Sequence, residues 1–204
     1  MRFKKFIFSV FAAGFLFSCA TKKRASRPQV FFPSVVAVLP FHNYTNDLQG
    51  PDVTRSLLEI SLNRHGYRMI DAKTVNSRLK EMGITDGGQL GGVRSKELGA
   101  KLGADGLLYG DLLEFKNVNL GVFANRKVEL KLKLVDAKTG DIVWEKKREK
   151  SHKKFAAKKP QVKKILVEGY AEKVMENIRR SPLREESEEV VRLLVQDLNK
   201  IRKK

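Results

Sequence analysis

A near-continuous apolar run at residues 35–39, followed by Pro40 and Phe41, constrains the fold more than any other stretch. The run is rich in β-branched valine and shows no polar alternation, which predicts a strand buried on both faces. Pro40 stands at the end of this strand, where the sheet needs no backbone donor. A strand of this kind is typical of an α/β fold, in which other layers cover both sides of a sheet.

Strand and helix patterns alternate after this run. Proline suits the first turn of a helix, so Pro51 marks the start of one helix, and Gly66 ends it. Asp71 is a suitable N-cap for a second helix, which Gly83 closes. The predicted elements are a helix at 50–66, a strand at 67–70, a helix at 71–83 and a helix at about 95–102.

A glycine-rich segment at residues 85–92 lies between the second and third of these helices. A dinucleotide-binding fingerprint needs a strand directly before its glycines, and a P-loop ends in lysine followed by serine or threonine. Here a helix precedes the glycines and the lysine ending is missing. We therefore expect a plain loop and no phosphate site.

Three further strands are predicted at residues 105–115, 127–136 and 142–146, with a hairpin turn at 136–140. The middle strand alternates strictly: one face carries Val128, Leu130, Leu132 and Leu134, and the other carries Lys127, Glu129, Lys131 and Lys133. One face is therefore expected to pack in the core and the other to face solvent. Two interpretations of the lysine face stay open: solvated lysines that block edge aggregation, which is the commoner case, or a surface for an anionic ligand.

The C-terminal region, residues 156–204, is basic and helical in pattern. Pro160 starts one helix, whose apolar positions run from Val162 to Ile178. A second helix starts at Ser181 and Pro182, with glutamates near its positive end and a stripe made of Val191, Leu194, Leu198 and Ile201. The stripe either packs on the sheet of this domain or forms a seam for a partner or a second copy.

The N-terminal segment has the pattern of an export signal. Three basic residues precede an uncharged run at residues 6–17, which as a helix of about 18 Å is too short to cross a hydrocarbon core of about 30 Å. The following LFSC at residues 16–19 resembles a bacterial lipobox. That resemblance implies that Cys19 is acylated, with palmitate or a similar chain, and becomes the mature N-terminus. Ala20 after it resembles the signal for the outer membrane.

Charge and cysteine content restrict the kinds of partner and site that the chain can have. The formal net charge is +18, and residues 1–18 hold three of the basic residues and no acidic one, which leaves +15 for the rest. In an exported protein this charge favours anionic lipid, acidic peptidoglycan or an envelope protein over nucleic acid. Because the chain has only one cysteine, an internal disulfide and a thiolate metal cluster are excluded.

No catalytic pattern stands out. His42, His65 and His152 lie in different segments and lack metal-ligand spacing. The carboxylates Asp105, Asp111 and Glu114 are the nearest approach to an acid–base site, yet the first two occupy strand-edge positions. We therefore expect no enzyme, no metal and no cofactor.

Several short runs carry a resemblance to a known family. They are VAVLPF at 36–41 with Asn43 and Thr45 after it, GY at 66–67, LGADG at 102–106, YG at 109–110 and TGDIVW at 139–144. This part of the chain resembles a family of lipoproteins of unknown function that includes a neisserial surface lipoprotein. More distantly, it is similar in fold to the TolB N-terminal domain, the curli secretion lipoprotein CsgG and the penicillin-binding-protein activator LpoB. The resemblance implies a mixed sheet with helices packed on it and a role in envelope assembly.

The sequence thus predicts an α/β (α+β) fold with a mixed sheet of about five strands in β-α-β-α-α-β-β-β order, followed by C-terminal helices. The expected organisation is a signal peptide at 1–18, a tether at 19–33, an α/β domain at 34–155 and a basic helical region at 156–204. The expected role is a lipid-anchored, non-catalytic interaction or assembly factor at the periplasmic face of the outer membrane. The alternative is an accessory or ring-forming component of a curli-type secretion system, which would be a homo-oligomer.

Overall fold

The computed structural model describes residues 32–120, 123–155 and 181–203. Cys19, the signal peptide, nearly all of the tether and the helix expected from Pro160 lie outside the described residues. The elements are β1 (Val35–Val38), β2 (His42–Asn43), α1 (Gly50–Arg64), β3 (Arg68–Ile70), α2 (Ala72–Glu81), the 3-10 helix η1 (Gly87–Gly92), α3 (Ser95–Leu102), β4 (Gly106–Asn119), β5 (Phe123–Asp136), β6 (Ile142–Phe155) and α5 (Arg184–Arg202).

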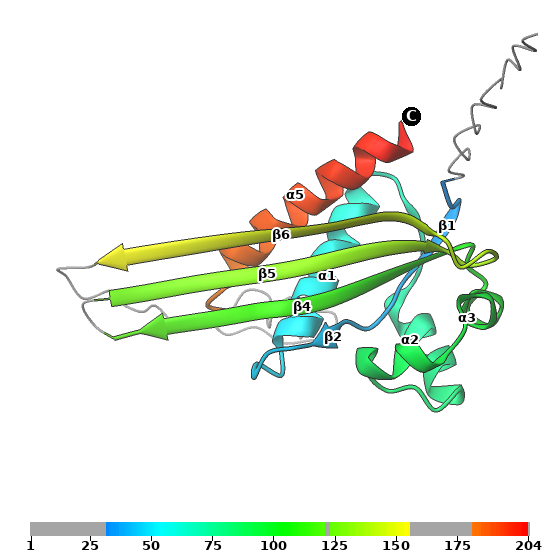
Figure 1. Cartoon of the computed structure of the whole chain (residues 1–204), viewed down its shortest axis with the longest axis horizontal. Coiled ribbons are helices and arrows are strands. Elements are labelled where there is room, and N and C mark those ends of the chain that lie inside the picture. The colour runs from blue at the N-terminus through cyan, green and yellow to red at the C-terminus, as the bar shows by residue number, and fades with distance from the viewer. Residues whose placement is uncertain (1–31, 121–122, 156–180, 204) are drawn as a thin grey trace, which may run out of the picture.

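The strands form one mixed sheet with the order β3-β1-β4-β5-β6, and the two-residue β2 also pairs with β4. Strand β1 is parallel to both of its neighbours, whereas β4, β5 and β6 are antiparallel to one another. Figure 1 shows these three long strands extending beyond the rest of the sheet. The predicted α/β fold with a mixed sheet and packed helices is confirmed.

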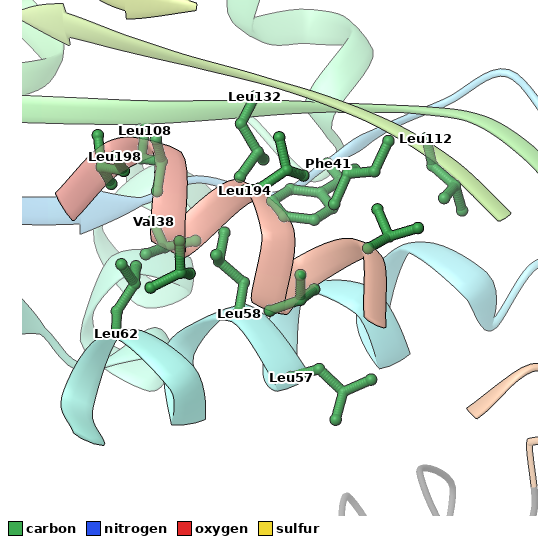
Figure 2. Packing of buried hydrophobic residues seen from close by; sticks show 14 of the residues in the cluster. Val38, Phe41, Leu57, Leu58, Leu62, Leu108, Leu112, Leu132, Leu194 and Leu198 are labelled. Carbon is green, nitrogen blue, oxygen red and sulfur yellow. The ribbon is translucent and has the colours of Figure 1, made fainter. Parts of the chain in front are cut away.

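Helices cover both faces of β1. Val36 and Val38 belong to the core cluster that includes α1 and α5, and Ala37 and Leu39 belong to the cluster that includes α2 and α3. All four side chains are at most 3% exposed, which confirms a strand buried on both faces. Figure 2 shows the first cluster from close by, with leucines of α1, β4, β5 and α5 around Phe41.

The apolar stripe of α5 packs on the sheet of this domain. Val191, Leu194 and Leu198 are at most 2% exposed and share their cluster with β4 and β5, and Ile201 packs against it. The alternative in which this stripe forms a partner seam is therefore wrong. Polar contacts fix the end of the helix as well, because the Tyr67 hydroxyl donates to Asn199 Oδ1 over 2.7 Å.

The predicted bounds of α1, α2 and α3 are confirmed to within two residues, whereas α5 begins at Arg184 and not at Ser181 as predicted. Asp71 Oδ1 accepts from the Thr74 backbone N–H over 2.9 Å and so caps α2. The chain leaves α1 and α2 through Gly66 and Gly83, whose φ values of +70° and +77° suit glycine.

Two local predictions need correction. Residues 87–92 form a 3-10 helix instead of a plain loop, because Asp86 and Gln89 complete a capping box at its start. The long strands also run further than the apolar pattern indicates: β6 continues to Phe155, paired with Phe123 of β5. Charged side chains that pair across the strands sustain this extension where apolar alternation has stopped.

Candidate functional site

The residues singled out as possible catalysts do not come together. His42 lies in β2, His65 follows α1 and His152 lies in β6. Within residues 32–120, 123–155 and 181–203, no three His, Cys, Asp or Glu side chains are grouped to hold a metal ion. Among these residues there is also no helix with the length and apolar character needed to cross a bilayer.

The three candidate carboxylates have separate structural environments. Asp105 accepts backbone N–H groups of Ser34 over 3.0 Å and Val35 over 2.6 Å, so it fixes the start of β1. Asp111 lies opposite His42 in the β2–β4 register. Glu114 is 3.1 Å from the ammonium groups of both Lys116 and Lys127, which holds the pKa of this carboxyl below its ordinary value, Lys116 having the larger effect. No acid–base pair results.

The polar loop after Phe41 has a structural role. Asn43 Oδ1 accepts from the Thr45 backbone N–H over 3.0 Å and from its hydroxyl over 2.8 Å. Asp47 Oδ1 accepts from the backbone N–H groups of Gln49 and Gly50 over 2.9 and 2.7 Å. These bonds satisfy donors at the start of α1, where a helix has no internal acceptors. The loop therefore positions α1 on the sheet.

No described helix packs on most of the face of β4–β6 that points away from α1 and α5. We call this face the open face. Figure 1 shows α2 and α3 at one end of the long strands only, so that the rest of this face carries no described helix. The register places these side chains on it: Asp111, Glu114, Lys116, Lys127, Glu129, Lys131, Lys133, Glu145, Lys147 and Glu149.

Ion pairs connect all three strands across the open face. Lys127 Nζ lies 3.1 Å from Glu114, 3.2 Å from Glu129 and 3.0 Å from Glu149, and Lys147 Nζ lies 2.7 Å from Glu129. The hydrogen bond from Lys147 is the main cause that lowers the pKa of Glu129, and the bond to Glu149 is the main cause that raises the pKa of Lys127.

This pairing decides what the open face can do chemically. Lysines lower the pKa of Glu114 and of Glu129, so these two carboxylates are poor general acids near neutral pH. Lys131 pairs with Glu145, and Lys133 lies 5.0 Å from the centre of the Tyr109 ring. A flat surface with fixed and alternating charges suits recognition of another molecule better than a reaction.

A buried ionic cluster lies on the opposite face, and no sequence pattern predicts it. Glu186 of α5 is fully buried, 2.9 Å from His152 Nδ1 and 3.0 Å from Arg126 Nη2. In the sequence this glutamate looks like one of several favourable charges at a helix start. Only the pairing of Arg126 with His152 across β5 and β6 reveals its partners. The cluster ties α5 to the sheet.

A shallow hollow of about 430 Å³ lies between α3 and the β5–β6 turn. Small apolar side chains line most of it, and two lysines stand at its rim. The one carboxylate in its lining, Asp105, is already bonded to the start of β1. The hollow therefore holds no free group for catalysis.

Comparison with known proteins places the chain among lipoproteins. A curated protein of Neisseria meningitidis serogroup B, described as "Putative lipoprotein", is 26% identical over 112 residues, which are 55% of this chain. The match spans about half of that relative, 52% of its length.

Two solved structures share the fold. The crystal structure of lipoprotein GNA1162 from Neisseria meningitidis is similar with a TM-score of 0.56 and 23% identity, over 62% of this chain and 88% of that one. A hypothetical protein of Chlamydia trachomatis is similar with a TM-score of 0.50 and 13% identity, over 82% of this chain and 96% of that one. The family model described as "Putative lipoprotein GNA1162-like" matches residues 21–200, and the chain belongs to this family.

Proposed function

We propose that the chain is an exported lipoprotein, held by acyl chains on Cys19, that acts as a non-catalytic interaction or assembly factor at the periplasmic face of the outer membrane. Membership of a lipoprotein family supports the anchor. The LFSC run at residues 16–19 supplies a thiol in the expected place for acylation, and Ala20 favours the outer membrane. Two or more acyl chains give stable attachment, whereas one gives only marginal binding.

One observation carries the interaction role: β4, β5 and β6 are each 14 residues long and present an open face that no described helix covers. Apolar burial on the other face already holds these strands in place. The open face is thus available for a partner without any loss of core contacts. Its fixed charges would select the partner and its orientation.

Anchoring makes a weak contact effective. A tethered domain meets its partner at a raised local concentration, so that a modest affinity of the open face is sufficient. The mature tether would set how far from the bilayer the domain can act. The partner in this proposal is another envelope component, and an envelope protein is the first candidate.

Three measurements in cells test the proposal. Growth with a labelled fatty acid should label the wild-type chain and leave Cys19→Ala unlabelled, and fractionation should move the variant out of the outer membrane. Crosslinking in intact cells should then capture the partner with the wild-type chain and much less of it with Cys19→Ala. Finding the wild-type chain unprocessed and unlabelled in the cytosol would contradict the proposed acyl anchor.

Mass measurement in detergent separates the proposal from the ring alternative. A monomer or dimer is expected for an adaptor. A large closed ring would support the accessory component of a secretion system instead.

A further inference from the structure

The far ends of the long strands differ in charge from the rest of the open face. Glu129 of β5 lies opposite Glu114 of β4 and Glu149 of β6 in the sheet register. These three residues are the last carboxylates along the three strands. Beyond them, residues 115–128 and 150–155 contain six lysines and arginines and no acidic residue. We call the described residues 116–120, 124–127 and 150–153 the ribbon tip.

Apolar side chains are exposed at the ribbon tip. Leu120 is 71% exposed and Val118 is 39% exposed. Val118, Asn125 and Lys153 form one row across the three strands, so Val118 and the lysine lie on the same face. Exposed apolar side chains bordered by basic ones are the composition of segments that bind a membrane surface.

Neighbouring acidic groups neutralise only part of this charge. Glu185 and Glu186 of α5 contact Arg126, and Glu114 contacts Lys116 and Lys127. Lys153 is exposed and forms no ion pair within the described part of the chain. The row that holds Val118 and Lys153 thus keeps a positive charge that no described carboxylate compensates.

We propose that the ribbon tip binds the anionic headgroup surface of a lipid bilayer. Lys153 would contact lipid phosphates, while Leu120 and Val118 enter the boundary between headgroups and acyl chains. An anionic polysaccharide would attract the lysine equally, but it has no apolar phase in which the apolar side chains could be buried. The exposed apolar residues therefore favour lipid as the partner. The contact is peripheral, because two apolar residues cannot reach across a bilayer.

The reach of the chain permits contact with the anchoring membrane. Pro33 packs at Gly106, where β4 starts, so the tether joins the domain at the opposite end from the tip. A strand of 14 residues spans about 45 Å. Residues 19–33 extend to at most about 50 Å. The domain can therefore lie along the bilayer that holds Cys19, an arrangement that rests on the proposed function.

Vesicle binding tests the inference without the acyl anchor. The chain from residue 20 onward keeps all described elements and their core contacts. It should co-sediment with vesicles of phosphatidylglycerol and phosphatidylethanolamine, much less with phosphatidylcholine, and the binding should weaken in salt. Equal binding to both kinds of vesicle, or none to either, would overturn the inference. Acyl labelling of Cys19 is a separate readout, so the two proposals fail independently.

Matched variants locate the contact. Leu120→Ser should weaken vesicle binding about tenfold, whereas Leu48→Ser, at a site 88% exposed before α1, should leave it unchanged. Lys153→Glu reverses one charge and should weaken binding about twentyfold, whereas Lys73→Glu on α2 changes the same net charge with an effect below about twofold. Similar losses in the tip and control variants would mean general charge attraction and would contradict a site at the tip.

Discussion

The two faces of β5 are made from opposite kinds of residue and have opposite environments. Val128, Leu130, Leu132 and Leu134 are fully buried under α1 and α5. Between them, Lys127, Glu129, Lys131 and Lys133 form ion pairs and a cation–ring contact on the open face. Apolar burial contributes most of the stability of a fold, while exposed ion pairs contribute little. The open face can therefore serve binding at small cost to folding.

The largest contrast between the faces should appear with Leu132→Ala. This change opens a cavity under α5 and should lower the free energy of unfolding by about 3 kcal/mol. Its neighbour Lys131→Ala removes only the pair with Glu145 and should cost less than about 1 kcal/mol. Urea unfolding of both variants measures the difference. Similar losses would contradict the division between a structural face and a binding face.

Glu186→Gln tests whether charge also stabilises the covered side. The change removes a fully buried carboxylate that contacts Arg126 and His152, and it should lower the free energy of unfolding by about 2 kcal/mol. Glu188→Gln is the matched control, because this glutamate lies on the same helix, is 46% exposed and pairs only with Arg184 among the described residues. Its expected cost is below about 0.5 kcal/mol. Equal costs would show that the cluster does not tie α5 to the sheet.

The smallest expected effect is the pH response of the open face. Lys147 lowers the pKa of Glu129 below its ordinary value of 4.5, so the stabilisation from this pair is present above about pH 4.5 and is lost as the pH falls further. Glu129→Gln should cost about 1 kcal/mol at pH 7, because this carboxylate is only 9% exposed, and much less at pH 3. Urea midpoints at both pH values measure this. A cost that stays constant with pH would mean that packing, not charge, acts at this position.

Most of the covered side was predictable from the sequence. The double burial of β1, the alternation of β5 and the cap at Asp71 each leave a local pattern that a single stretch of sequence reveals. The length of β6 left no such pattern, because residues 149–154 are polar on both faces. It is a strand only because β5 pairs with it along its whole length, and that pairing is a tertiary property.

The candidate site was less predictable than the fold. The sequence shows that Lys127 and Glu129 share a face, but the partners that fix their charges, Glu114 and Glu149, come from two other strands. No sequence pattern indicates that Glu186 is buried and paired, because its partners are more than 30 residues away in sequence. Acylation at Cys19 stays a prediction, because this residue lies outside the described part of the chain.

The most direct test of the account is photocrosslinking in intact cells from the uncovered part of the open face and, as the control, from the outer surface of α2. A photoreactive residue is placed at Lys133 or Lys147 on the open face, and at Ser77 on the exposed side of α2 as the control. The account predicts discrete crosslinks to an envelope component from the open face and none from α2. Crosslinks from Ser77 alone, or none from either open-face position, would contradict it.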